Sequence, residues 1–267
     1  MKQESCKVFF KNSFRLRGLI LVLLVFSTSY MVGCGKDNEV SPTPPPPPPT
    51  PPPVEVEWEL VFQDDFNGTA VDQSVWGMYN GPGHAGNGLR RPEAFSVADG
   101  ILTVTAQMID GQLVSGGMAH KQNLTYGKFE ARVRADVDSS FATSAVLLTW
   151  PQSENWPVDG ENDFYETTTN DRQSFHTFIH YGADNKQFHK EHDFDATKWL
   201  TVAMEWDPNW IKIYVNGNLQ WTLTEKQAIP DVPHHLCIQL DAFQKTMTGV
   251  TRMQVDWVKV YERVVKN

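Results

Sequence analysis

Short stretches that alternate apolar and polar residues recur along most of this sequence, and they constrain its fold more than any other feature. The clearest lie at 101–107, 127–137, 199–206 and 253–262, with turn residues between them. Alternation with a period of two gives a strand one buried face and one polar face. A helical period extends over no more than a short piece at 224–230. We therefore predict an all-β fold, a β-jelly-roll sandwich of two antiparallel sheets.

Two further stretches refine this prediction. The pair Asn216-Gly217 separates two strand-like runs, and Asn-Gly is the strongest short signal for a β-hairpin. The stretch HLCIQLDAF at 235–243 alternates leucine and isoleucine with cysteine, glutamine and aspartate. Because a sandwich buries the apolar faces between its sheets, we expect the polar face of this strand to line a groove.

The first 33 residues are typical of an export signal. Basic residues precede the apolar run 19–26, which is much shorter than the roughly 20 residues of a membrane-spanning helix. Small residues lead into Cys34, as in a bacterial lipobox, where the cysteine is lipidated. An ordinary secretory signal is the alternative. We expect residues 1–33 to be a lipoprotein signal peptide, and the protein to be lipid-anchored in the bacterial cell envelope, at the periplasmic face or the cell surface.

Residues 34–55 are predicted to be a proline-rich linker. Proline has a fixed φ and no amide donor, so the run SPTPPPPPPTPPP at 41–53 forms neither helix nor sheet. In the polyproline II form this run would hold the following domain roughly 40 Å from the anchor. Residues 56–267 then form one domain, since some 210 residues suit one large all-β unit.

Composition limits the chemistry and the partners. The chain has three cysteines, Cys6, Cys34 and Cys237, and processing at Cys34 would leave Cys237 without a disulfide partner. Cys237 lies in a strand-like stretch, so we predict a buried, inert thiol. The net charge of -9 and the absence of a basic patch argue against a nucleic-acid partner. We expect a monomer.

The acidic stretch GENDFYE at 160–166 carries the strongest functional signal. Glu161, Asp163 and Glu166 stand among aromatic residues in it. On a regular strand Glu161 and Asp163 share one face and Glu166 points away, because side chains alternate. One β-bulge between Asp163 and Glu166 would bring all three carboxyl groups onto the same face.

Three carboxyl groups on one face fit a retaining glycosidase. Such an enzyme uses two carboxyl groups about 5 to 5.5 Å apart, one as nucleophile and one as acid. Repulsion between like charges keeps one of them protonated near neutral pH. The residues alone do not assign the two roles. A calcium site and a solvated surface are the alternatives, although calcium loops are usually richer in Gly, Asp and Asn and like charges are unfavourable on one strand face.

Most of the domain resembles glycoside hydrolase family 16, a concanavalin A-like jelly-roll family of laminarinases and other endo-β-glucanases, agarases, carrageenases and xyloglucan-active enzymes. Several blocks in the order of the family carry this resemblance: LVFQDDFNGTAVDQSVW (60–76), SVADGILTVTAQ (96–107), YGKFEARVRA (126–135), GENDFYE (160–166), MEWDPNWIKIYVNG (204–217) and MQVDWVKVYE (253–262). The resemblance implies an endo-acting glycoside hydrolase that cleaves internal β-glycosidic bonds of a polysaccharide, a β-glucan, with retention and through a covalent glycosyl-enzyme.

The resemblance also implies roles for the acids. Glu161 would be the nucleophile, Glu166 the general acid and then base, and Asp163 the partner that hydrogen-bonds the nucleophile. His84 stands where better-known laminarinases have tryptophan, so the resemblance does not imply their standard preference for β-1,3-glucan. The resemblance leaves room for a structural calcium at Asp65 and Asp256, and the reaction itself needs no cofactor.

Contacts to the substrate are expected from aromatic, amide and imidazole side chains, because sugar rings present apolar faces ringed by hydroxyls. The candidates are Tyr79, Asn80, Asn87, Trp150, Trp156, His180 and Gln239. Asn162 occupies a position that is usually apolar in the family and faces away from the acids. An unpaired buried amide is unfavourable, so we expect Asn162 to have a local hydrogen-bond partner.

Two other functions stay open at this point. The same fold occurs in lectin-like carbohydrate-binding modules that have no catalytic activity. Such a module would be expected to lose one of the glutamates, whereas this chain keeps all three acids. A transglycosylase is the second alternative, in which a sugar hydroxyl instead of water captures the covalent intermediate.

Overall fold

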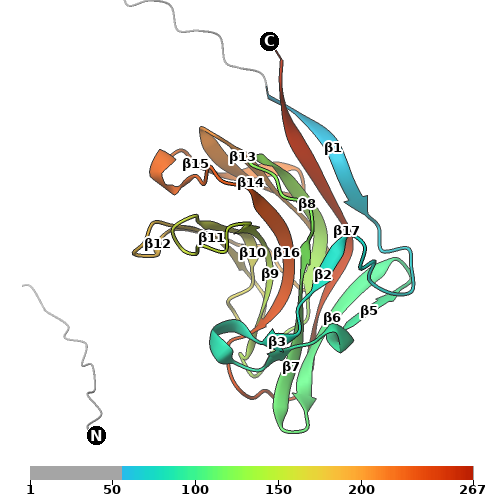
Figure 1. Ribbon diagram of the computed structural model, residues 1–267. Coiled ribbons are helices and arrows are strands. Elements are labelled where there is room, and N and C mark those ends of the chain that lie inside the picture. The colour runs from blue at the N-terminus through green and yellow to red at the C-terminus, as the bar shows by residue number, and fades with distance from the viewer. Residues whose placement is uncertain (1–55, 267) are drawn as a thin grey trace, which may run out of the picture. The chain divides into compact units, whose positions relative to one another are not determined.

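The computed structural model describes residues 56–266, and these residues confirm the predicted all-β jelly-roll sandwich. The predicted signal peptide (1–33), the lipidation at Cys34 and the linker (34–55) lie outside this range and stay predictions. Within 56–266 no helix is long and apolar enough to cross a membrane. Figure 1 shows the strands in two curved layers, with the end of β17 beside β1.

One layer, here called sheet B, has the strand order β12-β11-β10-β9-β16-β7-β2, and all its neighbouring strands are antiparallel. Its strands are β2 (Trp76–Met78), β7 (Gln112–His120), β9 (Thr143–Pro151), β10 (Glu161–Glu166), β11 (Phe175–Tyr181), β12 (Lys186–His192) and β16 (His234–Ala242).

The other layer, sheet A, has the order β15-β14-β13-β8-β17, and β17 continues the sheet by pairing with both β1 and β6. Its strands are β1 (Val56–Asp64), β5 (Phe95–Ala98), β6 (Ile101–Ile109), β8 (Gly127–Ala135), β13 (Leu200–Asp207), β14 (Trp210–Val215), β15 (Asn218–Leu223) and β17 (Val250–Val265).

Strand β7 joins the two sheets, because its first residues pair with β6 and its later residues pair with β16. The short strand β4 runs parallel to β7 and pairs with β3. These and the remaining short elements are β3 (Gly81–Pro82), β4 (Leu89–Arg90) and the 3-10 helices η1 (His84–Gly86), η2 (Pro92–Ala94) and η3 (Lys226–Ala228). The helical piece expected near 224–230 is therefore a single turn.

The hydrophobic core lies between the sheets, and β16 shows how alternation builds it. Leu236, Ile238 and Leu240 point into this core and are buried. Cys237 points to the opposite face, where it packs in a separate small cluster with Val146 and Leu148 of β9. The prediction of one apolar and one polar face for this strand is confirmed.

The hairpin predicted at Asn216-Gly217 is also present. Strands β14 and β15 pair from Val215 and Asn218 on either side of this two-residue turn. Both turn residues have positive φ, +49° for Asn216 and +78° for Gly217. Positive φ at both positions is the requirement of a type I′ turn, whose twist matches that of the two strands.

Replacing Leu240 by alanine tests the assignment of β16 to the core. Leu240 is 0% exposed, whereas Leu219 on β15 is 52% exposed. The Leu240→Ala change should lower the free energy of unfolding by about 2 to 5 kcal/mol, since it removes buried apolar contacts and leaves a cavity. Leu219→Ala, the matched control, should change it by no more than about 0.5 kcal/mol. Urea unfolding of both variants measures the difference, and equal effects would contradict the assignment.

Candidate active site

A β-bulge in β10 brings the three acids together, as the sequence predicted. Against β9, Asp163 pairs with Leu148 and Tyr165 with Leu147, so two steps on β10 match one on β9. Phe164 is the extra residue, and it is fully buried together with Tyr165. After the bulge the alternation is reset, and Glu166 emerges on the same face as Glu161 and Asp163.

The three acids line a cleft of about 470 Å³ on the outer face of sheet B. Its lining side chains come from β9, β10, β11, β12, β16, η1 and the loops next to them, so the cleft runs across the strands. They are His84, Val146, Leu148, Trp156, Glu161, Asp163, Glu166, Thr168, Phe178, His180, Asn185, Gln187, Asp241 and Phe243. The prediction that the polar face of β16 lines a groove is confirmed by Asp241.

Glu161 and Asp163 each have a fixed partner in this cleft. The indole Nε1 of Trp156 donates a hydrogen bond of 2.7 Å to Oε2 of Glu161. The Nε2 atom of His180 lies 3.2 Å from Oδ2 of Asp163, and Nδ1 of the same ring lies 2.8 Å from Oδ1 of Asn185. These contacts orient both carboxyl groups before any substrate binds.

Glu166 lacks a comparably close donor among the described residues. The hydroxyl of Ser144 is 3.5 Å from its Oε1 and donates a shorter bond of 2.8 Å to the carbonyl of Thr167. Burial, followed by the negative charges of Asp241 and Glu161, raises the pKa of Glu166 to about 7. Glu166 therefore retains its proton up to near-neutral pH.

Burial raises the pKa of Glu161 and of Asp163 as well, and neighbouring carboxyl groups add to the effect. For Glu161, the positive charge of His180 and the hydrogen bond from Trp156 act in the opposite direction and lower the pKa. A carboxyl group that receives a strong donor is the easier one to ionise. The geometry thus distinguishes Glu161, which has the indole donor, from Glu166, which does not.

Two tryptophans stand at the Glu161 end of the cleft. Trp156 is 40% exposed and lines the cleft, and the ring of Trp150 stacks on it at 6.2 Å and 13°. The Nε1 of Trp150 donates to Glu154, which fixes the position of that ring. Of these two predicted sugar contacts, Trp156 presents its surface to the cleft and Trp150 supports it.

The local partner predicted for Asn162 is present, and it belongs to a buried chain of hydrogen bonds. Asn162 Nδ2 donates to Thr149 Oγ1 at 2.9 Å. Burial lowers the pKa of His234 to about 4, so its ring is neutral; Nε2 donates to the carbonyl of Asp159 at 3.0 Å and Nδ1 accepts from Thr149 Oγ1 at 3.2 Å. These hydrogen bonds anchor the loop that leads into Glu161.

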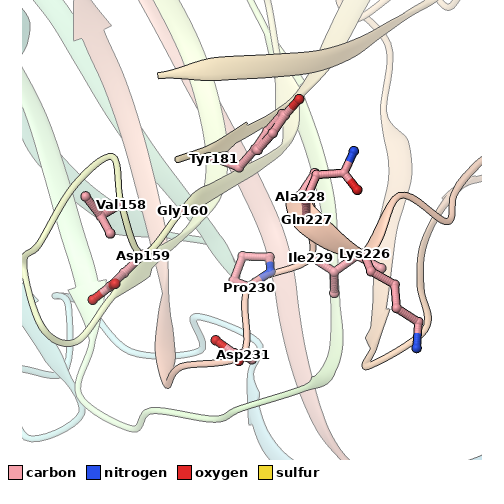
Figure 2. A pocket seen from close by; sticks show the side chains of 10 residues that line it. All are labelled: Val158, Asp159, Gly160, Tyr181, Lys226, Gln227, Ala228, Ile229, Pro230 and Asp231. Atoms are coloured by element: carbon pink, nitrogen blue, oxygen red, sulfur yellow. The ribbon is translucent and has the colours of Figure 1, made fainter. Parts of the chain in front are cut away.

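Gly160, the residue before Glu161, also fixes this loop. Its φ is +82°, and a Cβ atom there would lie 2.8 Å from Cγ of Pro230 and 3.2 Å from the carbonyl of His180. Pro230 is itself held, since its carbonyl accepts a bond from Trp206. Figure 2 shows Gly160 and Pro230 on the wall of a second hollow of about 240 Å³. Only glycine fits this position, so the backbone that leads into Glu161 is held in a single conformation.

The other predicted sugar contacts lie on the β7 and η1 side of sheet B. Gln239 is buried on the same face of β16 as Asp241. The Tyr79 ring packs against Gly117, and its hydroxyl lies 3.3 Å from Cys237 Sγ. Asn87 donates to the carbonyl of Phe243. Asn80 accepts from Arg91. His180 and Trp156 are thus the predicted contacts that lie beside the acids.

Cys237 is buried, and burial raises the pKa of its thiol to about 12. A thiol with this pKa is protonated and unreactive at neutral pH, as the sequence predicted.

Sequence reasoning placed Asp241 on the groove-lining face of β16 without naming it as a site residue, and it missed Phe178, which the alternation could also have identified. Asp241 stands two positions after Gln239 and shares its face, and Phe178 stands between His176 and His180 on their face. Another omission, Arg90, had no local signal, because its partner Asp241 is 151 residues away in sequence.

The three ligand atoms at Glu161, Asp163 and His180 do not suit calcium, and Asp65 and Asp256, suggested for a structural calcium, have protein partners in this structure. Glu161, Asp163 and His180 bring three potential ligand atoms within 4.8 Å of one another, but calcium prefers six to eight oxygens and one of these atoms is a nitrogen. Asp65 accepts two bonds from Gln63, and Asp256 is paired with Arg132. The structural calcium stays a prediction, and no step of the chemistry depends on it.

Known proteins with similar sequences are polysaccharide-degrading enzymes by name. The chain is 27% identical over 235 residues to a keratan-sulfate endo-1,4-beta-galactosidase of Sphingobacterium multivorum, which covers 77% of this chain and 56% of that protein. It is 29% identical over 144 residues to a beta-glucanase of Bacillus amyloliquefaciens, covering 54% and 55%. The chain thus spans about half the length of the curated relatives it matches.

Solved structures show the same fold. The laminarinase of Rhodothermus marinus is 25% identical and superposes with a TM-score of 0.68 over 78% of this chain and 99% of that one. The sequence pattern of Glycosyl hydrolases family 16 matches residues 88–259, which include the bulged strand and its three acids. With this match over more than half of its length, the chain belongs to family 16 of the glycosyl hydrolases.

Proposed function

We propose that this chain is a retaining, endo-acting glycoside hydrolase that cleaves internal β-glycosidic bonds of a polysaccharide. The observation that supports this most strongly is the bulge that sets Glu161, Asp163 and Glu166 on one face of β10, in an open cleft. A cleft that runs across the sheet suits binding in the middle of a long chain rather than at its end.

In the first step the Glu161 carboxylate attacks the anomeric carbon of the sugar on the glycone side. Glu166 donates its proton to the glycosidic oxygen as that bond breaks, so the leaving sugar departs as a neutral alcohol. The hydrogen bond from Trp156 favours the ionised form of Glu161. Burial favours the protonated form of Glu166. The product of this step is a glycosyl ester on Glu161.

In the second step the roles of Glu166 reverse. Its carboxylate takes a proton from water as the water oxygen attacks the anomeric carbon, and Glu161 leaves as a carboxylate. Two displacements at one carbon restore the original β configuration. Asp163 and His180 contact each other next to Glu161, so both side chains stay beside the nucleophile through the two steps. A sugar hydroxyl in place of water would give transglycosylation, detected as products longer than the substrate.

The substrate we propose is a β-glucan. Several relatives are named for β-glucans, including a glucan endo-1,3-beta-glucosidase of Niallia circulans and beta-glucanases of Bacillus amyloliquefaciens and Bacillus subtilis. The keratan-sulfate endo-1,4-beta-galactosidase covers a comparable share of the chain. A substrate panel therefore contains laminarin, mixed-linkage glucan, xyloglucan, agarose, carrageenan, a galactan and keratan sulfate, scored by new reducing ends.

Conservative replacement of either glutamate tests the proposed chemistry. On the polymer that wild type degrades, Glu161→Gln and Glu166→Gln should each lower kcat/KM by at least about 100-fold, because each removes a group that acts on the reacting bond. Glu205→Gln is the matched control: Glu205 lies on β13 of sheet A, where it accepts a bond from Tyr214, and its activity should equal that of wild type. Turnover near the wild-type rate in either cleft variant would contradict the assignment.

The pH profile tests the protonation state of Glu166. Activity needs its proton, so kcat/KM should fall as the pH rises through about 7, the pKa that burial and nearby charges give this group. The fall should occur while circular dichroism still shows a folded protein. A profile already in decline near pH 5, where an ordinary glutamate loses its proton, would show that Glu166 is not the acid.

A further inference from the structure

The β16 side of the cleft carries a fourth carboxyl group that the reaction does not use. Asp241 follows Gln239 by two positions, on the face that Cys237 shares, and its side chain is 7% exposed. It lines the cleft with the three acids. Gln239 pairs across the sheet with Val146, which lines the same cleft. Asp241 thus lies in the wall of the cleft, and Gln239 lies next to the cleft without lining it.

Arg90 holds Asp241 by one oxygen only. Its Nε and Nη2 both donate to Oδ1, at 3.2 and 2.5 Å. The guanidinium in turn lies 5.3 Å from the centre of the Tyr79 ring, which rests on Gly117. Within 56–266 no side chain or backbone group hydrogen-bonds Oδ2 of Asp241, so one oxygen of a rigidly held carboxylate remains as an acceptor.

Gln239 supplies a second acceptor beside it. Its Oε1 is buried and has no hydrogen-bond partner among the residues described. Buried polar atoms in native proteins are nearly always paired, so the unpaired amide oxygen next to the cleft adds an acceptor on the Asp241 side of it. Both atoms accept hydrogen bonds, and the partner they require is a hydroxyl or amide donor rather than another acceptor.

The charge of the cleft also favours a neutral ligand over an anionic one. Four carboxyl groups line it, and its lining contains neither lysine nor arginine. The nearest cation on this side, Arg90, is already paired with Asp241. A sulfate or carboxylate on a sugar placed over Asp241 would bring like charges together in a partly desolvated site, which is strongly unfavourable.

We propose that Asp241 forms a subsite for a neutral sugar residue, in which its free oxygen accepts a hydrogen bond from a sugar hydroxyl and its charge excludes sulfated or acidic residues. This inference rests on the proposed function and deepens it. The subsite selects for uncharged sugar residues next to the cleaved bond. Sugar residues of a sulfated polymer that lie further from this bond can still carry sulfate.

The test compares a neutral polymer with its sulfated form. Wild type, Asp241→Asn and Asp207→Asn are assayed on laminarin and chemically sulfated laminarin, and on desulfated and native keratan sulfate. Asp207 on sheet A is the matched control, because it pairs with Arg263 as Asp241 pairs with Arg90. The side chains of Asp207 and Asp241 are 1% and 7% exposed, and those of Arg263 and Arg90 are 19% and 21% exposed. Wild type should prefer the neutral member by at least about tenfold in kcat/KM.

In Asp241→Asn, the ratio of kcat/KM on the neutral polymer to kcat/KM on its sulfated form should fall by about tenfold. In Asp207→Asn this ratio should equal that of wild type. An unchanged ratio in a folded, active Asp241→Asn variant would overturn the subsite. If wild type cleaves none of these polymers or the wider panel, the proposed function fails first, which separates the two outcomes.

A second readout needs no variant. Products of wild-type digestion of partially sulfated laminarin are sequenced by mass spectrometry. At least one of the two residues that flank each cleaved bond should be free of sulfate, while interior residues carry it. Sulfate on both flanking residues as often as on interior ones would contradict the proposal, even where Asp241→Asn does not fold.

Discussion

The bulge in β10 is the constraint on which the rest of the site depends. A regular strand would place Glu166 on the inner face, where the core has no room for a charged side chain. With Phe164 as the extra residue, two aromatic side chains fill the core and the next carboxyl group returns to the cleft. The neighbouring contacts keep this geometry fixed: Gly160 packs against Pro230, and Asn162 is tied through Thr149 and His234 to the loop before Glu161.

Burial and crowding in one cleft destabilise the charged forms of Glu161, Asp163 and Glu166, and each of these acids has different neighbouring donors. Trp156 gives Glu161 a strong hydrogen bond, and His180 lies against Asp163. Arg90 is paired with Asp241. Glu166 has only a distant hydroxyl, and burial raises its pKa to about 7. Pairs of acids whose environments separate their proton affinities are the pattern expected of an acid and a nucleophile.

Local patterns in the sequence were sufficient for the fold and for the acids. Alternation identified the strands, Asn216-Gly217 identified a hairpin, and the spacing of Glu161 and Glu166 required a bulge. The partners of the acids were harder, because they come from distant segments: Arg90 meets Asp241 across 151 residues. Such contacts depend on how strands assemble into a sheet, and one sequence carries no local signal for them.

The measurement that tests the account most directly is the configuration of the first product. Proton NMR during early digestion of whichever polymer the enzyme cleaves distinguishes α from β at the new reducing end, before mutarotation mixes them. Two displacements through a glycosyl ester on Glu161 predict that the β anomer appears first. The α anomer first would mean one displacement by water, and would contradict the covalent role of Glu161.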